Sequence, residues 1–144
     1  AHSDNENYVP TYGRLYTWAA AMNREETSET NPSVVQGVCP TGWHLPSDDE
    51  WKELEMHLGM PELQAHKSEW RGTREGLKLK EIGDSHWREY YPNITGTNES
   101  GFTARPSGYR YLDGNFVGIG NQIAVELGFA VRDQLIEERL VVLL

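Results

Sequence analysis

The chain has 144 residues, a net charge of −9 and a single cysteine, Cys39. This length suits one domain with its own hydrophobic core, so residues 1–144 are predicted to form a single domain. The acidic balance argues against a nucleic-acid partner, and no apolar run approaches the roughly 20 residues that a membrane span requires. One cysteine allows no disulfide within the chain.

The first half of the sequence predicts two helices. Residues 1–10 are a polar N-terminal extension, residues 12–22 begin as a strand and end in a short helix near 17–23, and residues 23–36 form an exposed loop. A longer helix is expected over 47–58 because Ser47 and Glu50 have the spacing of a capping box. Its apolar stripe contains Trp51, Leu54 and Leu58.

The second half predicts short strands and turns. Alternation of leucine and lysine over 76–82 favours a half-buried strand, with a helical turn as the alternative. Segments 102–110 and 111–119 are predicted to form a hairpin around Asp113-Gly114-Asn115, since Asp-Gly supplies the positive φ angles of tight turns. Residues 128–132 are a further predicted strand, and residues 140–144 a strand or a helix end.

Five separated segments occur in an order that resembles a known family. They are Gly13–Trp18, Gly37–Trp51, Thr97–Phe102, Pro106–Arg110 and Gly128–Arg132. In this order they resemble the Fibrobacter succinogenes major paralogous domain, with residues 12–132 as the family-like region. The resemblance implies a C-type lectin-like fold, distantly similar to formylglycine-generating sulfatase-modifying domains. It also implies an exported or surface-attached protein of Bacteroidetes or Fibrobacter type, often a lipoprotein, without a settled activity.

The expected fold is therefore α+β, a mixed twisted sheet packed against two helices. The predicted core consists of Trp18, Trp43, Trp51, Leu54, Phe102 and Phe129. The chain departs from the family pattern near its end, where Asp133 stands at the position of a second cysteine and a tyrosine-rich hairpin is shortened. Residues 133–144 form an atypical tail, which either completes the sheet or contacts a partner in an assembly.

Two groups of residues are candidates for ligand binding. Trp87, Tyr90 and Tyr91 lie in a segment without helix or strand periodicity, and such aromatics stack on sugar rings or anchor proteins. Core packing beneath a loop is the other interpretation. Tyr111, Asp113 and Asn115 form a second group on the predicted hairpin, for which turn chemistry is the alternative.

The catalytic and metal-binding interpretations of other residues are less favoured. Cys39 is interpreted as structural, because it has no basic neighbour and the oxidase chemistry implied by the resemblance needs a cysteine pair. His44 is expected to be solvated or hydrogen-bonded. Helix capping accounts for the acidic run Asp48–Glu50, which together with Glu53 is the alternative calcium cluster. No catalytic residue, metal or cofactor is predicted.

The function expected from these observations is a non-catalytic binding or assembly module, extracellular or on the outer cell surface, that recognises a glycan or a surface protein. Two alternatives are an oxidase of the formylglycine-generating type or its inactive relict, and a structural subunit of an envelope complex that assembles through the C-terminal tail. No nucleic-acid partner is expected.

Overall fold

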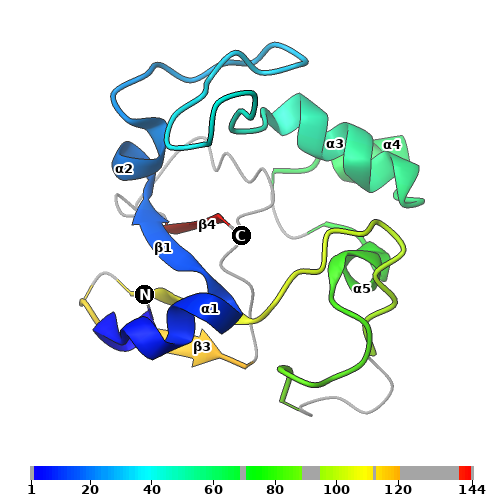
Figure 1. Ribbon diagram of the computed structural model, residues 1–144. Coiled ribbons are helices and arrows are strands. Elements are labelled where there is room, and N and C mark those ends of the chain that lie inside the picture. The colour runs from blue at the N-terminus through cyan, green and yellow to red at the C-terminus, as the bar shows by residue number, and fades with distance from the viewer. Residues whose placement is uncertain (1, 69–70, 89–94, 112, 121–139, 144) are drawn as a thin grey trace. The chain divides into compact units, whose positions relative to one another are not determined.

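The computed structural model describes residues 2–68, 71–88, 95–111, 113–120 and 140–143 (Figure 1). The chain folds into two compact units. Unit 1 comprises Ala1–Leu15, Thr73–Val125 and Val142–Leu144, and unit 2 comprises Tyr16–Gly72 and Glu126–Val141. Short helices are combined with small β-sheets, so the predicted α+β class is confirmed at this coarse level.

The helices and strands occur in the following order. They are η1 (His2–Asp4), η2 (Glu6–Tyr8), α1 (Val9–Tyr12), β1 (Arg14–Thr17), α2 (Trp18–Met22), α3 (Asp48–His57), α4 (Glu62–Ala65), α5 (Glu75–Leu79), β2 (Ser107–Arg110), β3 (Phe116–Ile119) and β4 (Leu140–Leu143). β1 pairs with β4, and β2 pairs with β3. In the described part of the chain, no helix is both long and apolar enough to cross a membrane.

Helix α3 confirms the capping-box prediction. The Glu50 amide donates to Ser47 Oγ over 3.3 Å, and the Ser47 amide donates to Glu50 Oε2 over 2.9 Å. Gly59, with φ of 103°, takes the left-handed conformation that stops the helix. The short helix predicted near 17–23 is present as α2, where Thr17 Oγ1 accepts from the Ala20 amide.

Helix α5 contradicts the favoured strand over 76–82 and confirms the helical alternative. The last carbonyls of this short helix need partners from elsewhere in the chain. The loop that follows residue 96 supplies them, because the amides of Thr97, Ser100 and Ala104 donate to the carbonyls of residues 77, 78 and 79 over 2.8–3.1 Å. Tertiary hydrogen bonds thus stabilise a helix that the leucine–lysine alternation does not indicate.

The predicted hairpin is confirmed in unit 1. β2 and β3 are antiparallel, with Ser107 opposite Ile119 and Tyr109 opposite Val117. At the tail, the strand alternative is confirmed over Leu140–Leu143 (Figure 1). The strand predicted at 128–132 lies outside the described residues.

The predicted core is wrong at two tryptophans. Trp43 follows a tight turn and is 72% exposed. Trp18 begins the short helix α2 at the surface and is 41% exposed. Neither residue lies within a strand. Trp51, Leu54 and Phe102 are not fully buried, and Phe129 lies outside the described residues. Among the described residues, the buried apolar side chains are Ala21, Met22, Val35, Leu45, Leu58, Met60 and Ala65 in unit 2, and Leu79 and Ala104 in unit 1.

Candidate functional site

The tip of the β2–β3 hairpin carries two adjacent tyrosines. Residues at i and i+2 of an extended strand share a face, which brings Tyr109 and Tyr111 together. Their ring centroids are 5.8 Å apart with planes tilted by 39°, and Tyr111 is 54% exposed. The hairpin therefore presents an aromatic surface to solvent in unit 1.

The turn beside these rings is held by its own polar side chains. Asp113 Oδ1 accepts from the Asn115 amide over 2.9 Å, and Asp113 Oδ2 accepts from Asn115 Nδ2 over 2.8 Å. The Tyr111 amide donates to the Asn115 carbonyl over 2.8 Å. Hydrogen bonds from Asn115 lower the pKa of the Asp113 carboxyl, so it is ionised at neutral pH. Three predicted site residues thus form one local structure.

Arg110 lies on the face of the hairpin opposite to the two tyrosines. It stands opposite Phe116 in the hairpin register, and its guanidinium lies 5.5 Å from the centre of the Phe116 ring. Arg110 Nε also donates to the Gly114 carbonyl over 3.1 Å. These contacts fix the turn from the other face, because side chains alternate along a strand.

Trp87 occupies a different environment in unit 1. Lys80 Nζ lies 3.8 Å from the centre of its ring, a cation–π contact that uses one face of the indole. The indole Nε1 is buried and has no hydrogen-bond partner among the described residues. Burial lowers the pKa of Lys80, although Asp84 and Glu81 oppose this shift. Trp87 is therefore half-buried, with Lys80 against one face of its indole ring.

The structure does not bring Trp87 to the tyrosines of the hairpin tip. The Arg88 amide donates to the Gly120 carbonyl, so Trp87 lies near the base of β3. The extended chain from Asn115 to Gly120 spans roughly 17 Å at about 3.3 Å per residue. Tyr90 and Tyr91, the other two predicted aromatics, lie outside the described residues.

A buried carboxylate in unit 1 organises a second polar cluster. Both oxygens of Glu81 lie 2.9 Å from His86 Nδ1, and Arg105 Nε lies 3.4 Å from Glu81 Oε2. Arg105 also donates to the Thr11 carbonyl. The carboxylate orients the imidazole as in catalytic dyads, but among the described residues no hydroxyl or thiol bonds to His86. The cluster connects separate segments of the unit.

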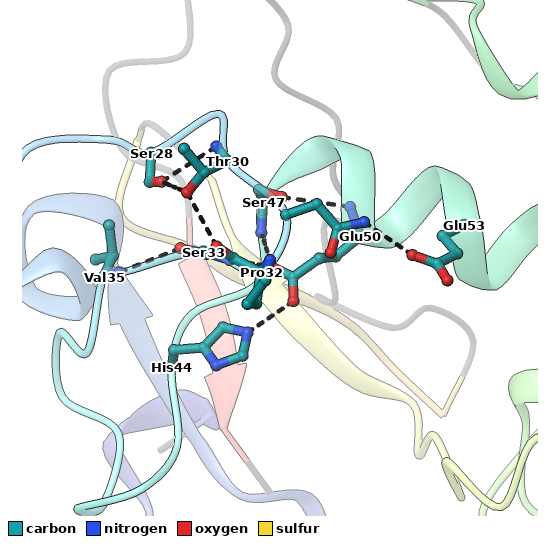
Figure 2. A network of polar contacts seen from close by, with 10 residues as sticks. Ser28, Thr30, Pro32, Ser33, Val35, His44, Ser47, Glu50 and Glu53 are labelled. Atoms are coloured by element: carbon teal, nitrogen blue, oxygen red, sulfur yellow. Dashed lines mark hydrogen bonds and ion pairs between the residues drawn. The ribbon is translucent and has the colours of Figure 1, made fainter.

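In unit 2, Glu50 organises a polar cluster that also pairs a glutamate with a histidine (Figure 2). Its Oε2 accepts from the Ser47 and Ser33 amides, and its Oε1 lies 2.7 Å from His44 Nε2. Burial alone would raise the pKa of Glu50, but the hydrogen bonds from Ser47, His44 and Ser33 outweigh it and lower the pKa. His44 is hydrogen-bonded, as predicted.

The other carboxylates of the calcium alternative have local partners. Lys52 Nζ lies 2.6 Å from Asp48 Oδ2 and 3.0 Å from Asp49 Oδ1. Glu53 Oε2 accepts from Asn31 Nδ2 over 2.8 Å. Across the ranges that the structure describes, no three histidine, cysteine or acidic side chains are arranged to hold a metal ion.

Cys39 follows a turn of unit 2, and its amide donates to the Gln36 carbonyl over 3.0 Å. It is a half-buried free thiol, and burial raises its pKa. Since the thiolate is the nucleophile and the metal ligand, this environment lowers the reactivity of Cys39.

Two features of the hairpin tip are not among the sequence predictions. Tyr109 is not a predicted site residue, although its i, i+2 spacing from Tyr111 places both on one face. The Arg110–Phe116 contact is also absent from the predictions. A two-residue turn at Asp113-Gly114 would place Arg110 opposite Val117, whereas the observed register places it opposite Phe116.

The fold and this surface together define a small α+β module with an exposed aromatic hairpin. Residues 1–125 match the Fibrobacter succinogenes major domain, and the chain belongs to this family. The match includes the segment 1–10 that the sequence assigned to an extension. Comparisons with curated proteins and with solved structures found no match.

Proposed function

We propose that this chain is a non-catalytic binding module that recognises a glycan or a surface protein through the tip of the β2–β3 hairpin. The observation that carries the proposal is the exposed ring of Tyr111, 54% accessible, beside Tyr109 and a turn fixed by Asp113 and Asn115. Tyrosine offers a large apolar area with a polar end, at a small entropic cost on binding.

The fold proposed for the module is C-type lectin-like, on the strength of the family resemblance and the capped helix α3 that follows the Trp43-His44-Leu45-Pro46 segment. The same resemblance supports an extracellular or outer-surface location, with a lipid anchor in the precursor, in a bacterium of Bacteroidetes type. The location is inferred from the family and not from the fold, because a fold alone does not define a function.

A non-catalytic role is supported by the polar clusters. Glu81 and Glu50 each bind a histidine and other groups of their own unit, which suits a structural role. The oxidase alternative requires a reactive thiol pair, whereas this chain has one cysteine with a raised pKa. For the tail, the β1–β4 pairing favours completion of a sheet over assembly with a partner.

A glycan array combined with capture of proteins from the outer surface of the source bacterium tests the proposal. The probe is the full chain, beside Tyr111→Ala and Trp43→Ala. Both variants remove an exposed aromatic, but Trp43 lies in unit 2. We expect Tyr111→Ala to lose the captured ligand and Trp43→Ala to retain it. Equal capture by all three proteins would refute the hairpin as the recognition surface.

A further inference from the structure

We propose that the hairpin tip selects neutral glycans, rich in hydroxyl groups and without acidic groups. This inference rests on the proposed function and adds the chemical class of the ligand. It follows from three features of the tip: an aromatic face, a turn rich in hydrogen-bond acceptors, and the balance of charge along the hairpin.

The aromatic face supplies contact area for a sugar ring. Tyr109 and Tyr111 lie side by side with centroids 5.8 Å apart, and Tyr111 is the more exposed of the two. Sugar rings present C–H groups that pack on the negative face of an aromatic ring. This contact is apolar and does not depend on a charge on the ligand.

The turn supplies polar recognition next to that face. The two Asp113 oxygens each accept one bond from Asn115, and a carboxylate has about four acceptor positions in all. Capacity for ligand hydroxyl donors therefore remains. Because Asn115 holds the carboxylate in place, little ordering entropy is lost when a hydroxyl binds.

The charge of the hairpin disfavours an anionic ligand. Between Ser107 and Ile119 there is one cation, Arg110, and one anion, Asp113. Arg110 is engaged with Phe116 and the Gly114 carbonyl, on the opposite face from the tyrosines. The ionised Asp113 lies at the turn beside Tyr111, and the whole chain carries −9. An acidic glycan is therefore repelled, whereas a neutral one is not.

Calorimetric titration with matched ligands tests this selection. The probes are glucan, galactan and mannan hexasaccharides, each beside the same oligosaccharide after oxidation of its primary alcohols to carboxylates. We expect at least one neutral probe to bind the full chain, and its oxidised form to bind at least tenfold more weakly at low ionic strength. Added salt should narrow this difference, since it screens exposed charges.

Three variants assign the effect to the tip. Tyr111→Ala should weaken the neutral ligand at least tenfold, while Trp43→Ala should leave its affinity unchanged. Asp113→Asn keeps an oxygen acceptor but removes the charge, so it should bring the affinity of the oxidised ligand closer to that of the neutral one. Far-ultraviolet circular dichroism of each variant confirms that the fold is retained.

The outcomes separate the two proposals. If the oxidised forms bind as tightly as the neutral ones or more tightly, or if only a protein ligand depends on Tyr111, the neutral-glycan inference is wrong while the hairpin remains the binding surface. If no glycan or protein ligand depends on Tyr111, both proposals are wrong.

Discussion

A buried ion pair in unit 2 shows how single residues determine local packing. Arg71 Nε donates to Glu55 Oε2 over 2.8 Å, and these side chains are 3% and 4% exposed. Arg71 also donates to the Lys67 carbonyl and lies 3.7 Å from Asp48. The pair fixes helix α3 to the segment that follows α4.

Removal of one member of this pair should be more harmful than removal of both. Arg71→Met is expected to lower the free energy of unfolding by about 3–5 kcal/mol, because it removes the cation that pairs with the buried Glu55 carboxylate. Arg71→Met combined with Glu55→Leu should recover most of that loss. Urea denaturation followed by circular dichroism measures all three proteins, and a double variant no more stable than Arg71→Met would contradict this interpretation.

Glu50 should make stability depend on pH. Its folded pKa lies below the ordinary value of 4.5, so its stabilising contribution is fully present above that pH and is lost as the pH falls through the folded pKa. Glu50→Gln should therefore be less stable than the parent at pH 7 and should lose less further stability on acidification. Thermal unfolding between pH 7 and pH 3 measures this, with the exposed Glu26→Gln as control. Parallel pH curves for parent and Glu50→Gln would refute the assignment.

At the scale of elements, the loop before α3 depends on one close approach. Gly37 has φ of 55°, and a Cβ there would overlap the Ala21 carbonyl oxygen and lie 2.6 Å from Leu45 Cδ1. Gly42 has φ of 88° but no atom within 4 Å of such a Cβ. Substitution of Gly42 therefore tests backbone strain alone, whereas substitution of Gly37 tests strain together with steric overlap.

Gly42→Ala should cost about 1–2 kcal/mol of stability, the strain of a left-handed alanine. Gly37→Ala adds overlap with backbone atoms, so its cost should exceed that of Gly42→Ala by about 1–3 kcal/mol. Chemical denaturation of both variants measures the difference. Equal costs would show that the loop does not pack against α2 as described.

Local signals in the sequence are enough to predict several elements. The capping box of α3 and the Asp-Gly turn of the hairpin depend on residues within a few positions of each other, so both predictions are confirmed. The sequence of helix α5 does not favour a helix. The helix is stabilised instead by amides from a loop distant along the chain, which donate hydrogen bonds to its carbonyls. Trp43 is predicted to be buried because it is large and apolar, but such residues are often exposed, and Trp43 is.

The candidate site is predicted only in part for a similar reason. Asp113 and Asn115 are local to one turn and lie together as the turn chemistry indicates. Trp87 lies far from the tip because its position depends on the pairing of Arg88 with Gly120, which is distant in sequence. The burial of Glu55 is not predicted because sequence patterning treats a carboxylate as a surface group, whereas Arg71 compensates its charge.

For the molecule as a whole, the thiol distinguishes a binding module from an oxidase. Cys39 has a raised pKa, so we expect no copper-dependent consumption of dioxygen with a cysteine-containing peptide, and no tight binding of one copper ion per chain. An oxygen electrode and a copper titration measure these, with Cys39→Ala as the control. Turnover that disappears in Cys39→Ala would establish the oxidase alternative.

The most direct test of the central claim is the map of backbone amide shifts in the ¹⁵N-labelled full chain, recorded during titration with the neutral hexasaccharides. We predict that the largest shifts fall on residues 109–115, around Tyr111 and Asn115. Shifts that centre on Trp43 or on helix α3, with none at the hairpin tip, would contradict the account.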